Sequence, residues 1–156
     1  MEFCKEANVQ TRTMDEQSFL PMCREILAVG GQVPLRVTGV SMRPFLKEGR
    51  DTVWLAPLSA RVRRDDVLLF VRPSGKLVLH RVMRKRRGML QMIGDNQTEA
   101  ETIDETAAVA VVQRVQRGER MLDAHSLEWI FFKTIWRWLC PVRPLIWRLH
   151  RRVKGT

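Results

Sequence analysis

The stretch between residues 32 and 117 limits the possible fold more than any other part of the chain. It is a succession of short apolar runs, each four to eight residues long, separated by turn-forming residues such as the Arg-Pro-Ser-Gly-Lys cluster at 72–76. Short runs of this kind are typical of strands. There is no strand–helix–strand alternation and no internal repeat, so we predict a compact, twisted, mainly antiparallel β domain. The six expected strands are residues 34–37, 52–55, 67–71, 77–82, 89–93 and 108–115.

Residues 15–28 have the periodicity of a packing helix. Their apolar side chains recur at spacings of three and four, and Gly30 follows as a stop signal. Because proline is best tolerated in the first turn of a helix, Pro21 places the expected start near Ser18. We expect this helix to pack on the β domain through Phe19, Met22, Cys23, Ile26 and Leu27.

The C-terminal region combines aromatic residues with cations. Residues 127–139 are the most apolar stretch, and residues 145–154 repeat the pattern with more arginine. A helix over 127–139 would be about 20 Å long, too short for a hydrocarbon core of about 30 Å. An amphipathic helix of this kind suits a membrane interface, while packing on the β domain or on a partner is the alternative. The expected division is 1–31 (tail and packing helix), 32–118 (β domain) and 119–156 (helical tail).

The charge balance points to an anionic partner or surface. The chain has 27 Lys and Arg against 17 Asp and Glu, a net charge of +10. No helix-turn-helix precedes the β domain, which argues against DNA as that partner. The cysteines at 4, 23 and 140 form neither a CxxC pair nor a metal-ligand cluster, so we expect no disulfide framework and no metal or other cofactor. Since no apolar segment precedes residue 41, we expect no signal peptide and a cytoplasmic location, possibly peripheral on the inner face of the membrane.

Residues 38–49, with the sequence TGVSMRPFLKEG, hold a serine at a constrained junction. Gly39 permits a positive φ just before Ser41, and Pro44 keeps Arg43 out of helical conformation. The hydroxyl of Ser41 should therefore be held in place, as a nucleophile requires. A lone serine in a turn usually has no chemical role, so the residues that follow it decide its meaning.

Four blocks occur in a familiar order: the serine block, residues 65–70, residues 77–82 and the Gly-Asp-Asn of 94–96. This order resembles the signal peptidase and SOS-repressor superfamily of serine peptidases, and the likeness covers about residues 33–118. The resemblance implies that family's β fold, attack of Ser41 on a peptide carbonyl, and His80 as the base, as in the histidine-type branch. The chain departs from the family pattern by one extra residue before Asp51 and by Asp65 in place of a glycine.

His80 is the best-placed base because the other candidates, Lys76 and Lys85, fall in expected exposed turns. A serine needs a neighbouring base, and a histidine pKa of about 6.5 suits that task near neutral pH. A catalytic histidine also needs a partner on its other ring nitrogen. The resemblance offers Asp95 for this role or as a residue that shapes the site, with Glu101 as the second candidate. The alternative interpretation of Asp95 is a turn former, because Asp and Asn beside Gly are common in turns. A buried structural histidine is the alternative interpretation of His80.

These observations predict a serine endopeptidase that cleaves a specific protein or leader peptide through an acyl-enzyme. The predicted catalytic residues are Ser41, His80 and Asp95. The alternative is a catalytically inactive binding module that keeps the peptidase fold and docks on a membrane or a partner protein.

Overall fold

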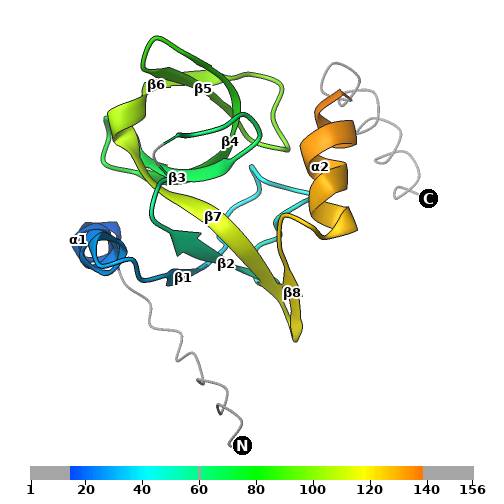
Figure 1. Ribbon diagram of the computed structural model, residues 1–156, viewed down its shortest axis with the longest axis horizontal. Helices are drawn as coiled ribbons and strands as arrows, with labels where there is room; N and C mark the ends of the chain where they lie inside the picture. Colours follow the sequence, from blue (N-terminus) through cyan, green and yellow to red (C-terminus); the bar gives the residue numbers. More distant parts are fainter. Residues whose placement is uncertain (1–14, 60, 139–156) are drawn as a thin grey trace, which may run out of the picture.

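The computed structural model describes residues 15–59 and 61–138 (Figure 1). Within this part of the chain, eight strands form one antiparallel sheet accompanied by two α-helices, which confirms the mainly β class. A short 3-10 helix, η1 (Glu105–Ala107), connects β6 directly to β7. The helices and strands are α1 (Glu16–Ala28), β1 (Val33–Arg36), β2 (Asp51–Ala56), β3 (Val67–Val71), β4 (Leu77–Arg86), β5 (Met89–Ile93), β6 (Glu101–Asp104), β7 (Ala108–Arg117), β8 (Arg120–Leu122) and α2 (Leu127–Trp138).

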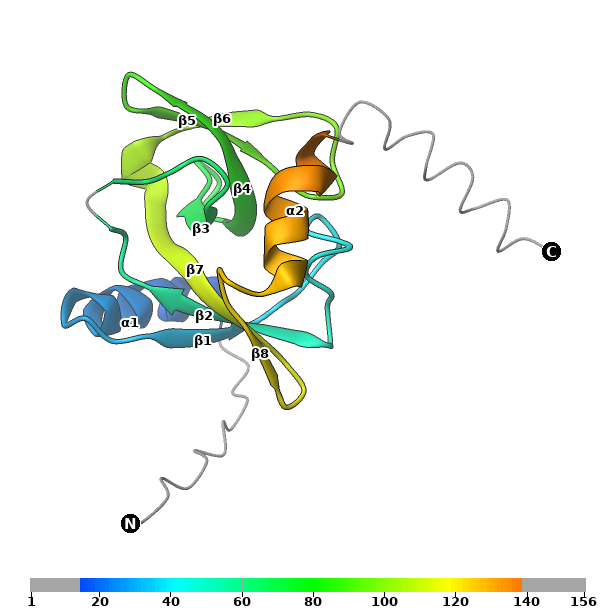
Figure 2. The same cartoon turned by 45° about the vertical axis from the view of Figure 1, so that its right-hand side comes forward.

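The long strand β7 joins the two halves of the sheet. The strand order is β1-β2-β7-β3-β4-β5-β6, with β8 also paired to β7. The N-terminal half of β7 pairs with β3 and the C-terminal half with β2. The register shifts once in each of the β2–β7, β3–β7 and β4–β5 pairs, and such irregularities bend and twist a sheet. The strands accordingly curve around one another in both views (Figures 1 and 2).

All six expected strands are present, and two further strands were not predicted. The unpredicted ones are β6, with a single buried apolar residue, Ile103, and β8, which has three residues. Lys85, which belongs to the basic run at 84–87, was expected in an exposed turn, and so was the rest of that run. Most of it instead lies in β4, and the turn falls at Arg87 and Gly88, both with positive φ.

Helix α1 begins earlier than predicted. Asp15 caps it by accepting a hydrogen bond from the main-chain N–H of Ser18, so the first turn starts at Glu16 and not near Ser18. Pro21 consequently lies inside the helix, beyond the first turn in which it was expected. The predicted packing face is confirmed, because Phe19, Cys23 and Leu27 are buried.

The buried side chains form two clusters. One lies between α1, the β1–β2–β7 part of the sheet, the serine block and α2, and the other is enclosed by β3, β4, β5 and β6. Trp129 and Phe132 of α2 belong to the first cluster. The sheet also continues past residue 118 as β8. The described part of the C-terminal region is therefore packed on the β domain, and residues 139–156 lie outside the described residues.

Neither described helix has the length and apolar character that crossing a membrane requires.

Candidate functional site

Ser41 lies in a turn between β1 and β2 that is docked on a second loop. Gly39 has a φ of +77°, as the sequence predicted. The main-chain oxygen of Ser41 accepts a 2.7 Å hydrogen bond from the N–H of Asn96. Gly94 packs so closely that a Cβ added there would lie 2.5 Å from the same oxygen. The Gly-Asp-Asn block thus fixes the backbone at Ser41, and only a glycine fits at 94.

A buried aromatic cluster packs against the serine turn. Phe45 is fully buried, with ring centroids 5.4 Å from Trp129 and 5.0 Å from Phe132. The guanidinium carbon of Arg81 lies 5.2 Å from the centroid of the Phe45 ring, within the range of a cation–π contact. Met42 is buried in the same hydrophobic cluster as Phe45. Helix α2 therefore helps to hold the serine turn.

The buried carboxylate of Asp51 holds the end of the segment between Ser41 and β2. It accepts hydrogen bonds from the main-chain N–H of Lys47 and from the guanidinium groups of Arg50 and Arg117. Arg117 also donates to the main-chain oxygen of Phe45 at 2.8 Å and pairs with Glu128 of α2. The hydrogen bonds from the two arginines hold the pKa of Asp51 below its usual range despite its burial. This network connects the end of the serine block with β7 and α2.

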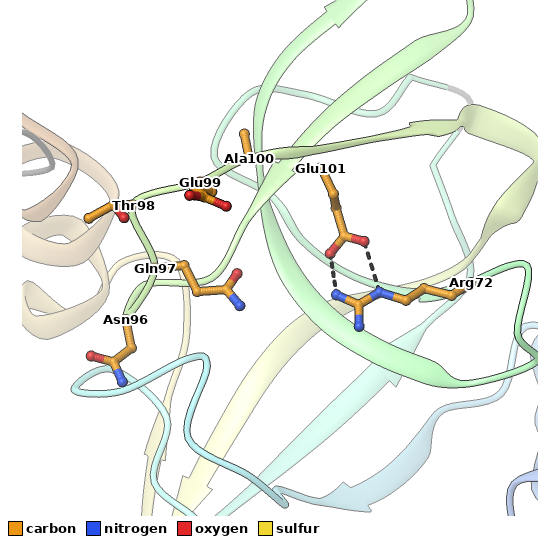
Figure 3. A pocket seen from close by; sticks show the side chains of 7 residues that line it. All are labelled: Arg72, Asn96, Gln97, Thr98, Glu99, Ala100 and Glu101. Atoms are coloured by element: carbon orange, nitrogen blue, oxygen red, sulfur yellow. Dashed lines mark hydrogen bonds and ion pairs between the residues drawn. The ribbon is translucent and has the colours of Figure 1, made fainter.

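His80 lies in β4 and is almost completely buried, at 1% exposure. Its ring centroid is 5.9 Å from that of Phe70 in the second cluster. Its Nδ1 lies 2.8 Å from Oε1 of Glu101, and Arg72 holds the same carboxylate with two hydrogen bonds of 2.8 and 2.7 Å. The pair formed by Arg72 and Glu101 is drawn in Figure 3.

Burial favours the neutral imidazole of His80, and hydrogen bonding to Arg72 favours the ionised carboxylate of Glu101 through their effects on the two pKa values. Burial lowers the pKa of His80 below its ordinary value, and the nearby Glu101 opposes this shift only in part. Hydrogen bonding to Arg72 lowers the pKa of Glu101. A neutral imidazole beside an ionised carboxylate is the resting arrangement of a general base.

Neither ring nitrogen of His80 makes an aligned hydrogen bond within the described chain. Nδ1 is near Glu101 as an ion-pair contact, and Nε2 is buried without a partner. The hydrogen bond from Ser41 to His80 that a preassembled dyad would show is therefore not formed. The ring keeps a nitrogen available to accept a proton.

Asp95 does not hold the position predicted for it. Its carboxylate accepts hydrogen bonds of 2.9 and 2.7 Å from Arg81, and both side chains are buried. The carboxylate at Nδ1 of His80 is that of the second candidate, Glu101, so the structure pairs His80 with Glu101 and pairs the preferred candidate, Asp95, with Arg81. Sequence reasoning underrated Glu101 because β6, the strand that carries it, was not predicted.

Arg81 connects the serine turn to the strand of His80. Successive side chains of a strand point to opposite faces, so His80 contacts Phe70 on one side of β4 while Arg81 reaches Phe45 on the other. Through Asp95, Arg81 also holds the 94–96 loop on which Ser41 rests. The structure thus links the two predicted catalytic residues through this ion pair and the loop.

A cavity of about 440 Å³ opens beside the pair of Arg72 and Glu101. The cavity is lined by residues 96–100 of the loop between β5 and β6, by Glu101 at the start of β6, and by Arg72 (Figure 3). Among the described residues there is no group of three or more His, Cys, Asp or Glu side chains that could hold a metal.

In comparisons with known proteins, no family model matches the chain, and the search of curated proteins finds no match either.

Proposed function

We propose that this protein is a serine endopeptidase with Ser41 as nucleophile, His80 as general base and Glu101 as the acid that orients the base. The observation that supports this proposal best is the environment of His80. The ring is buried, has a carboxylate at Nδ1 and keeps Nε2 without a partner. A carboxylate at one ring nitrogen and a second nitrogen without a partner are two features of a base that accepts a proton during nucleophilic attack.

In the proposed reaction, Nε2 of His80 takes the proton of Ser41 as Oγ attacks the peptide carbonyl. The ionised Glu101 stabilises the imidazolium, which then donates its proton to the leaving amine. Water hydrolyses the acyl-enzyme, again with His80 as base. Attack requires Oγ to come within about 3 Å of Nε2, and catalytic hydrogen bonds often tighten to this distance only with substrate bound.

The proposed substrate is a specific protein or leader peptide that reaches the site along the cavity beside Glu101. We place the enzyme in the cytoplasm, on the inner face of the membrane. The odd number of scattered cysteines supports a reducing compartment. Burial also raises the pKa of the Cys23 thiol, which disfavours the reactive thiolate.

A non-catalytic binding module is the second candidate. One observation favours it: His80 is 1% exposed, and no hydrogen bond joins it to Ser41. In this case His80, Glu101 and Arg72 would be a structural charge cluster between β3, β4 and β6.

A serine-reactive fluorophosphonate probe with peptide mapping distinguishes the two. The peptidase should be labelled at Ser41, and labelling should be lost in both Ser41→Ala and His80→Gln. The variant Ser74→Ala, at an exposed turn between β3 and β4, is the matched control and should label normally. Because a nucleophile and its base act as a unit, the double variant should be no worse than either single one. Absence of labelling in the folded wild-type protein would favour the binding module.

A further inference from the structure

Helix α2 presents large apolar side chains to solvent. Leu127 is 85% exposed, Ile130 42%, Phe131 38% and Ile135 53%. In contrast, Trp129 and Phe132 of the same helix are buried against Phe45 (Figure 2 shows α2 beside the serine turn). Packing on the domain therefore accounts for only one side of this helix.

The exposed residues occupy one continuous face. At about 100° per residue, positions 127, 130, 131 and 135 fall within one arc, opposite to positions 129 and 132. Thr134 lies in the middle of this arc, and its hydroxyl donates a 2.6 Å hydrogen bond to the main-chain oxygen of Ile130. Its polar group is thus already satisfied within the helix. We call residues 127, 130, 131, 134 and 135 the outer face of α2.

Charged side chains of both signs border this face, and the negative one, Glu128, is already paired with Arg117 of β7. The exposed Lys133 lies on its border. The sequence that continues from α2, residues 139–156, contains no Asp or Glu and carries five cations, which are Arg143, Arg148, Arg151, Arg152 and Lys154. An apolar helix face joined to a cationic segment is complementary to a lipid surface with anionic headgroups.

We propose that the outer face of α2 binds the surface of an anionic bilayer. The helix lies in the plane of the interface, with Phe131 and Ile135 among the acyl chains and Lys133 at the headgroups. A second copy of this chain fits the face less well, because two molecules with a net charge of +10 repel each other. This inference does not depend on the proposed peptidase activity, since its test measures binding alone.

Sedimentation of the full chain with vesicles tests the proposal. The vesicles contain either phosphatidylcholine alone or phosphatidylcholine with about a third phosphatidylglycerol. We expect binding to the anionic vesicles that weakens with added salt. The double variant Phe131→Ser/Ile135→Ser should bind at least about tenfold more weakly, because it removes two apolar side chains from the lipid contact.

The matched control is Val29→Ser, because Val29 is as exposed as Leu127 but lies at the end of α1. It should bind like the wild-type protein, while Leu127→Ser should bind more weakly. Thermal unfolding of each variant verifies that it is folded.

Three results would overturn the proposal. The first is failure of the wild-type chain to bind anionic vesicles, and the second is equal binding by the double variant and the control. The third is a concentration-dependent dimer that the double variant abolishes in the absence of vesicle binding, which would assign the outer face to a second copy.

Discussion

Nδ1 of His80 lies 2.8 Å from Oε1 of Glu101, although β5 separates the two strands that carry them. Arg72 donates to both oxygens of the same carboxylate. These hydrogen bonds lower the pKa of Glu101, so the carboxylate facing the ring is ionised at neutral pH. A buried imidazole next to such a carboxylate can become positively charged for a short time at a lower free-energy cost than an isolated one.

The first prediction concerns Glu101→Gln, which keeps the size of the side chain and removes its charge. If Glu101 stabilises the imidazolium, peptidase activity should fall by roughly tenfold or more, a part of the 10²–10⁴ that acid–base catalysis contributes. The control is Glu99→Gln, which neutralises an exposed acid lining the same cavity. Steady-state cleavage or probe-labelling rates measure the effect. Equal activity of the two variants would remove Glu101 from the mechanism.

The second prediction concerns Asp95→Asn. It leaves the guanidinium of Arg81 buried without its compensating charge, so the free energy of unfolding should fall by about 3–5 kcal/mol. Denaturant titration measures this loss. Arg81→Met removes the charge itself, and in combination with Asp95→Asn it should recover part of the stability. A stable but inactive Asp95→Asn protein would instead make Asp95 the orienting acid.

The third prediction follows from the lowered pKa of His80. Above the ordinary histidine pKa of about 6.5, the imidazole is neutral in both the folded and the unfolded chain. In this pH range the protonation of His80 therefore takes nothing from the free energy of unfolding. As the pH falls below this value, the unfolded chain binds the proton first, so stability is lost at up to about 1.4 kcal/mol per pH unit. The lowered pKa of Glu101 acts in the same direction at more acidic pH, below about 4.3.

Chemical unfolding at several pH values between 7 and 5 measures this dependence. His80→Phe should make the curve flatter in this window, while His125→Phe, at an exposed position, should leave it unchanged. If the wild-type and His80→Phe curves have the same slope, protonation of His80 is not linked to folding.

The fourth prediction tests whether α2 belongs to the domain. Phe132→Ala removes a ring that packs on Phe45, and it should lower the free energy of unfolding by about 3–5 kcal/mol. Phe131→Ala, at the neighbouring partly exposed position, should cost much less. Deletion of residues 124–156 should likewise destabilise the β domain, since it removes Trp129 as well. A deletion that leaves the unfolding midpoint unchanged would contradict this packing.

The β class could be predicted because most of the strands are short apolar runs separated by turn-forming residues. β6 escaped prediction since Ile103 is its only buried apolar residue, and β8 escaped it because three residues carry too little pattern. On a helical wheel, Phe131 and Phe132 fall on the same broad apolar arc, but the structure buries Phe132 and leaves Phe131 38% exposed. The wheel shows a wide apolar arc without showing which part of it meets the domain.

The candidate site, like the fold, could be predicted from the sequence only in part. The sequence points to Ser41 and His80 through block order, but strand pairing decides which carboxylate reaches the ring. Asp95 and Glu101 are both acids in the 94–101 region, and the pairing of β5 with β6 brings Glu101 to His80 while Arg81 takes Asp95. Register of this kind depends on contacts between distant residues, which no local pattern in one sequence contains.

The last prediction concerns Gly94→Ala. The φ of Gly94 is not in the left-handed region, so any effect must come from space alone. The added Cβ would lie 2.5 Å from the main-chain oxygen of Ser41 and 2.9 Å from Oε1 of Gln97. Backbone cannot yield as a flexible side chain does, so the serine turn must move away from the 94–96 loop. Overpacking of this kind costs about 1–3 kcal/mol of stability, and the displaced Ser41 should lose most of its reactivity toward a fluorophosphonate.

Gly75→Ala is the control for this prediction, because it combines a positive φ of +83° with open space around the added Cβ. It should cost about 1–2 kcal/mol through backbone strain in the turn between β3 and β4 and leave Ser41 fully reactive. The two variants therefore have similar stability but different reactivity if the contact between Gly94 and Ser41 positions the nucleophile. Equal reactivity toward the probe would show that the loop supports the fold without aligning Ser41.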